Sequence, residues 1–152
     1  MAEVKFTSRA YYNAAQEHLK RAVSLRAQGE HFAAHYFAGV AVEAMLRAVS
    51  VKDGEPFDSS HSIEYWAKKA RPLLKVSENR QNKIASALLE VNLRWRANQR
   101  YYTSKMLDTY LHNTNLDGNI RGDRVKASSG RMLELADIVI AEGVERWKRK
   151  TL

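Results

Sequence analysis

The sequence predicts an all-α protein, an up-and-down helical bundle of four long helices plus one short helix. Apolar residues recur at helical spacing over most of the chain, and no stretch of useful length alternates as a strand would. A length of 152 residues fits a single domain, residues 1–152, that can bury a real core. The chain has no cysteine, which excludes disulfides, thiolate metal sites and a cysteine nucleophile.

The first helix is predicted over residues 7–29. Thr7 or Ser8 can cap its start, and Gly29 is a natural stop. The next helix follows almost at once, and so tight a connection makes the two helices antiparallel neighbours.

The second helix, residues 31–50, is apolar almost all the way round, which is typical of a helix buried among others. Small residues, with Gly39 among them, allow neighbouring backbones to come close. Glu43 is a lone acid within this apolar run and needs a partner, since an unpaired buried carboxylate is costly. Arg47, one turn further on, is the nearest candidate.

A loop over residues 52–60 precedes a short third helix, predicted from His61 to Leu74. Pro72 lies in its last turn and should end or kink it. The sequence therefore predicts that this helix is the short one of the five.

The fourth helix restarts at Ser77 and is expected to continue through Tyr102, with Trp95 in its core stripe. A second apolar side allows two interpretations: contact with another subunit, or a broader core face. The core stripe holds Ile84, Leu88, Val91, Trp95 and Tyr102, and the second side holds Leu89, Leu93 and Ala97.

Residues 113–123 are polar and turn-rich, and a last helix is predicted from Arg124 to Lys150. The basic tail Arg146–Lys150 complements the dipole of that helix, which gives part of its charge a structural reason.

A net charge of +8 and a pI near 9.8 favour acidic partners, nucleic acid first, although a solvated basic surface is the simpler interpretation. The charge concentrates between Arg94 and Lys105, where four bases occur and no acid. On a continuous helix Arg96 and Arg100 share one side, and Arg94 lies on the other flank near Tyr101. Arginine forks bind phosphates and tyrosine stacks on bases. The predicted nucleic-acid or nucleotide-binding residues are Arg94, Arg96, Arg100, Tyr101, Tyr102 and Lys105; alternatively, Arg100 is a structural partner of Glu43 or of a helix end.

The stretch HYFAGVAVEAMLRA resembles the second helix of the HEPN family, small all-α domains of toxin–antitoxin systems and of proteins beside nucleotidyltransferases. The likeness rests on a small residue near Gly39, an acid at Glu43 and a base at Arg47, and on His61-Ser62-Ile63 as the opening of the third helix. The order of helices is also similar, over about residues 8–147. The resemblance implies a helical bundle that forms a homodimer.

Nuclease members of that family carry an arginine followed, after four to six residues, by a histidine. Here Arg94 or Arg96 could stand for the arginine, but Arg100 or a tyrosine takes the histidine position, and arginine stays protonated. The sequence therefore favours a module that binds RNA, nucleotide or a partner protein without catalysis. The alternatives are a toxin-type, metal-independent ribonuclease using Arg96, Arg100 and Tyr101, or a companion subunit of a nucleotidyltransferase. An antitoxin or a nucleotidyltransferase is the protein partner that the resemblance implies.

No metal site and no cofactor are expected. His31 and His35 lie one turn apart, but no third ligand other than Glu30 is near, so a structural pair is the simpler interpretation. No phosphate loop, dinucleotide fingerprint or serine-hydrolase elbow is present. The longest apolar run is expected to be too short and too Ala-rich to span a membrane, and the start MAEVKFTSR has no signal core, so a cytoplasmic location is expected.

Overall fold

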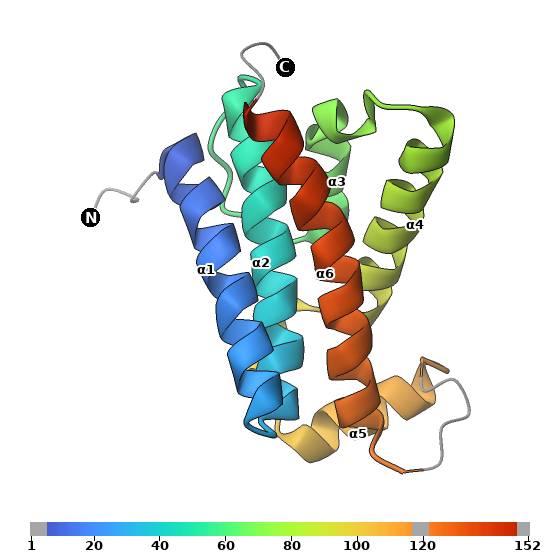
Figure 1. Ribbon diagram of the computed structural model, residues 1–152. Coiled ribbons are helices and arrows are strands. Elements are labelled where there is room, and N and C mark those ends of the chain that lie inside the picture. The colour runs from blue at the N-terminus through green and yellow to red at the C-terminus, as the bar shows by residue number, and fades with distance from the viewer. Residues whose placement is uncertain (1–5, 117–121, 149–152) are drawn as a thin grey trace.

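The computed structural model describes residues 6–116 and 122–148 and confirms the all-α class, since the described part of the chain contains helices and no strand. Long helices lie side by side along one axis, and a shorter helix crosses one end of them (Figure 1). The α-helices are α1 (Ser8–Ala27), α2 (His31–Lys52), α3 (Ile63–Lys69), α4 (Glu78–Arg94), α5 (Ser104–Asn113) and α6 (Arg124–Lys148), joined by the 3₁₀ helices η1 (Arg71–Leu74) and η2 (Ala97–Tyr101).

The central helix is α2, with α1 and α6 packed along it (Figure 1). Every residue from 41 to 50 is buried, as the all-round apolar pattern predicts. The expectation that this run is too short and too Ala-rich for a membrane span is wrong, because α2 has 22 residues and is long and apolar enough to cross a membrane by length and composition. In this structure, however, 72% of its most apolar window is buried inside the bundle. The apolar run is therefore accounted for by the protein core.

The predicted start and stop signals of the first helix are confirmed. Thr7 Oγ1 accepts a hydrogen bond from the amide of Ala10, which caps α1. Gly29 has a φ of +81°, a conformation that glycine adopts without strain, and it reverses the chain into α2.

The count of four long helices and one short helix is not what the structure shows. The predicted third helix is divided at Ala70 into α3 and η1, and Pro72 lies inside η1. The prediction that the fourth helix continues through Tyr102 is wrong, because α4 ends at Arg94 and the chain continues as η2 and α5. Of the predicted last helix, Arg149 and Lys150 lie outside the described residues.

Two apolar clusters hold the bundle together. The larger one joins α1, α2, α3, α4 and α6. The smaller one lies beneath α5 and contains Leu107, Leu111 and Val125, with Tyr102 packed against it. The segment between Arg94 and Ser104 therefore crosses from one cluster to the other, on the outside of the bundle.

Candidate functional site

The end of α4 is fixed by an indole ring that lies on a glycine. Trp95 leaves the helix in an extended conformation, is only 2% exposed, and donates a hydrogen bond from Nε1 to the carbonyl of Tyr36 at 3.0 Å. A Cβ at Gly39 would lie 2.1 Å from Cδ1 of this ring. The prediction that Trp95 points into the core is confirmed. Gly39 is closely packed as expected, but against this indole ring and not against the backbone of a neighbouring helix, and the contact explains why α4 stops.

A second, polar anchor fixes η2. Gln99 is fully buried, its Oε1 lies 3.2 Å from Nε2 of His35, and its Nε2 donates to the carbonyl of Arg94 at 2.9 Å. The Nδ1 of His35 lies 3.1 Å from the hydroxyl of Ser128 on α6. These buried bonds join η2 to α2 and α6, so the backbone of the exposed segment is held in one place.

Burial lowers the pKa of His35 from 6.5 to about 4, mainly because the charged imidazole would be cut off from water. The unfolded chain then binds a proton that the folded chain does not bind, so stability falls as the pH drops from about 6.5 to about 4, by about 3 kcal/mol. Urea unfolding across this range should show that loss in the wild type and much less of it in His35→Gln. A slope in His35→Gln equal to that of the wild type would contradict the assignment.

After the end of α4, three basic side chains and one tyrosine between residues 96 and 105 are exposed: Arg96, Arg100, Lys105 and Tyr101. Tyr101 is 76% exposed, and the guanidinium of Arg100 lies 5.1 Å from the centre of its ring. We call residues 96–105, which contain no acid, the basic segment.

Arg94 is set apart from these residues. Its Nε donates to Glu90 at 2.7 Å and its Nη1 to Ser128 at 3.2 Å, and its side chain is only 14% exposed. Arg131 binds the same carboxylate through two bonds of 2.7 Å and lowers the pKa of Glu90. The continuous helix on which Arg94 was placed beside Tyr101 is not present, because α4 ends at Arg94, whose side chain is mostly buried and contacts α6.

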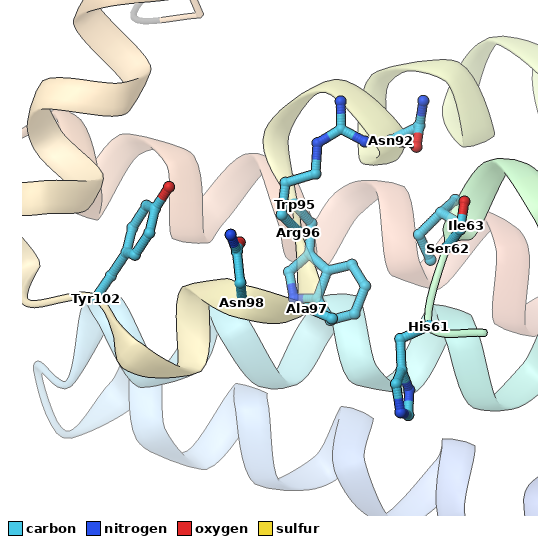
Figure 2. Close-up of a pocket in the computed structure, with 9 residues that line it drawn as sticks. All are labelled: His61, Ser62, Ile63, Asn92, Trp95, Arg96, Ala97, Asn98 and Tyr102. Atoms are coloured by element: carbon cyan, nitrogen blue, oxygen red, sulfur yellow. Dashed lines mark hydrogen bonds between the residues drawn. The ribbon is translucent and has the colours of Figure 1, made fainter. Parts of the chain in front are cut away.

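A pocket of about 380 Å³ opens between the end of α4, the start of η2 and the segment that enters α3. Figure 2 shows that the side chains of Asn98 and Tyr102 point in the same direction as that of Arg96, which extends toward Asn92. We call this the amide pocket; it is lined by His61, Ser62, Ile63, Asn92, Trp95, Arg96, Ala97, Asn98 and Tyr102.

The imidazole of His61 is turned away from Arg96 (Figure 2). Its Nδ1 lies 3.2 Å from Glu43, whose other oxygen accepts from Arg47 Nε at 3.2 Å. Arg47 also donates to the carbonyls of Asp58 and Ser60. The prediction that Glu43 is paired with Arg47 is confirmed; Arg100 is not among the partners that the structure gives Glu43.

Sequence reasoning missed four residues of this region. Gln99 was overlooked because a lone polar residue between exposed arginines is typical of a surface, and nothing local signals its burial. Asn92 and Asn98 flank Arg96 in sequence, and amides beside an arginine are a signal that could have been used. His61 was treated as a helix opening, and its contact with Glu43 joins residues 18 positions apart.

The described residues contain no group of three or more His, Asp or Glu side chains placed to hold a metal ion. Comparison with known proteins identifies no matching family, no matching curated protein and no matching solved structure.

Proposed function

We propose that this chain is an HEPN-like helical module that binds RNA through the basic segment and does not cleave it. One observation carries the proposal: α4 stops at Arg94, and the chain then runs outside the bundle with Arg96, Arg100 and Tyr101 all exposed. The segment is held there by the buried Trp95 and Gln99, so its arginines are presented on a rigid backbone.

The chemistry of the exposed side chains suits a single nucleic-acid strand. Guanidinium forks pair with phosphate oxygens, and an exposed tyrosine ring stacks on a base regardless of its identity. The acids nearest in sequence are engaged elsewhere: Glu90 binds Arg94 and Arg131, and Asp108 contacts Arg124 at 3.5 Å. A net charge of +8 adds attraction at longer range.

Binding without cleavage follows from the residues that face Arg96. Cleavage of RNA by a metal-independent route needs a group that moves a proton, and arginine does not do so near neutral pH. Among the residues that line the amide pocket, the one imidazole is that of His61, which is turned away from Arg96 (Figure 2) and has its Nδ1 3.2 Å from Glu43.

The test is a fluorescence-anisotropy titration with a labelled single-stranded RNA at about 50 mM salt, where electrostatic binding is strong. Arg96→Ala/Arg100→Ala should weaken binding about tenfold and flatten its salt dependence, because two phosphate contacts are lost. Lys83→Ala/Lys148→Ala removes the same charge from exposed positions on α4 and α6 and should change affinity far less.

No binding at low salt would refute the proposal. The remaining interpretation would be that the module binds a protein partner, such as an antitoxin or a nucleotidyltransferase. Cleavage that vanishes in the still-folded Arg96→Ala or Tyr101→Phe variant would make the protein a ribonuclease instead. The proposal places the protein in the cytoplasm, where RNA partners are present.

We also propose that the module is a homodimer that pairs through α4. Leu89 is 63% exposed and Leu93 45% exposed, beside an apolar groove of about 430 Å³ between α3 and α4. Light scattering at micromolar concentration should give about twice the chain mass of 17.4 kDa. Leu89→Asp/Leu93→Asp should halve that mass, whereas Val23→Asp, at an exposed position on α1, should not. A wild-type mass of one chain would contradict the dimer.

A further inference from the structure

The amide pocket is large enough for a small ligand and is lined by more than phosphate-binding groups. Its volume of about 380 Å³ lies at the small end of the range for ligand sites, about 300–1,000 Å³. A single nucleotide fits such a space, and a duplex does not. The pocket adjoins the basic segment because Arg96, Asn98 and Tyr102 belong to both.

The pocket is lined by both aromatic and polar groups. Tyr102 and the buried Trp95 provide aromatic surface, while Asn92, Asn98 and Arg96 provide polar atoms. Asn98 lines the pocket, is exposed on η2, and points in the same direction as Tyr102 (Figure 2). A primary amide both donates and accepts, which is what the edge of an unpaired base requires.

Arg96 is free to turn toward a phosphate. Its only hydrogen bond in the described part of the chain is a long one, 3.5 Å from Nη1 to Asn92 Oδ1. An incoming phosphate oxygen would form a shorter, charge-assisted bond and would replace that contact readily. The guanidinium would then stand at the rim of the pocket, where the backbone of an inserted nucleotide would pass.

We propose that the amide pocket takes one unpaired nucleotide of single-stranded RNA, with its base edge on Asn98 and its phosphate on Arg96. This inference rests on the proposed RNA binding and narrows it to unpaired RNA. Tyr101, outside the pocket and 76% exposed, would stack on the adjacent base. In a duplex the base edges are already paired, and the deep, narrow major groove hides them from side chains.

The experiment compares single-stranded RNA with the double-stranded form of the same sequence, by anisotropy at low salt. Simple charge attraction would favour the duplex, because it carries two phosphate backbones. The expected result is tighter binding of the single strand, by about tenfold, and loss of most of that preference in Asn98→Ala. Asn79→Ala, an exposed amide on the first turn of α4, is the matched control and should keep the preference.

The outcomes separate the two proposals. If neither RNA binds, RNA binding itself is refuted, and the pocket assignment falls with it. If both RNAs bind equally, or if Asn98→Ala leaves the single-strand preference unchanged, RNA binding stands and the pocket assignment is overturned. Circular dichroism of Asn98→Ala should match the wild type, since this side chain is exposed and loses no buried contact.

Discussion

Arg47→Met is expected to lower the free energy of unfolding by about 3–5 kcal/mol, because it leaves a buried carboxylate without its main partner. Arg47 is only 5% exposed in its side chain and bonds Glu43 and the carbonyls of Asp58 and Ser60. Its guanidinium also lies 4.6 Å from the ring centre of Trp66. Losing it therefore releases the loop that leads into α3 and leaves the buried carboxylate of Glu43 with only the His61 contact.

Urea unfolding monitored by circular dichroism measures the effect. Lys68→Met is the matched control, because it removes the partner of Glu64 in an exposed ion pair and should change stability little. Glu43→Gln/Arg47→Met should recover part of the loss, since the uncompensated charge is then gone. Equal stabilities of Arg47→Met and Lys68→Met would show that the buried pair does not support the fold.

Gly39→Ala is expected to cost about 3 kcal/mol, at the upper end of the usual range for overpacking. The added Cβ would lie 2.1 Å from the ring of Trp95, and that ring is buried and hydrogen-bonded, so it has nowhere to move. The larger Gly39→Leu should fail to fold.

Gly130→Ala provides the control of opposite sign. The Cβ at Gly130 would meet the end of the Arg26 side chain at 2.9 Å, and this side chain can shift. Alanine is a better helix former than glycine, so this variant should be unchanged or up to about 1 kcal/mol more stable. If Gly39→Ala is as stable as Gly130→Ala, the close contact between α2 and Trp95 is not present in solution.

The sequence was sufficient to predict the core, because the signals there are local or periodic. The apolar run of α2, the cap at Thr7 and the turn at Gly29 each have a direct physical cause in neighbouring residues. The pairing of Glu43 with Arg47 was predictable too, since the two residues lie one helical turn apart.

The end of α4 was not predictable in this way. Residues 94–102 contain no glycine or proline, and helical spacing continues through Trp95. The helix stops because Trp95 enters the space above Gly39, a residue 56 positions earlier in the chain, and because His35 provides a buried partner for Gln99. Tertiary contacts of this kind override local propensity and leave no local signal.

The candidate site also has one part that the local sequence predicts and another that depends on tertiary contacts. The exposure of Arg96, Arg100 and Tyr101 agrees with a basic stretch free of acids, although the predicted helix was wrong. The pocket beside them joins η2 to the start of α3, and its amides could be recognised only once these segments were seen together (Figure 2).

The central claim is that RNA binds on the basic segment, and photo-cross-linking with a single-stranded RNA containing 4-thiouridine tests it most directly. Trypsin cuts after Arg100 and after Lys105, so the two tyrosines of the segment fall in one short peptide, Tyr101–Lys105. That peptide should carry the dominant cross-link in the wild type and in Lys83→Ala/Lys148→Ala, and should lose it in Arg96→Ala/Arg100→Ala. Cross-links concentrated on α1 or α6 with Tyr101–Lys105 unmodified would contradict the account.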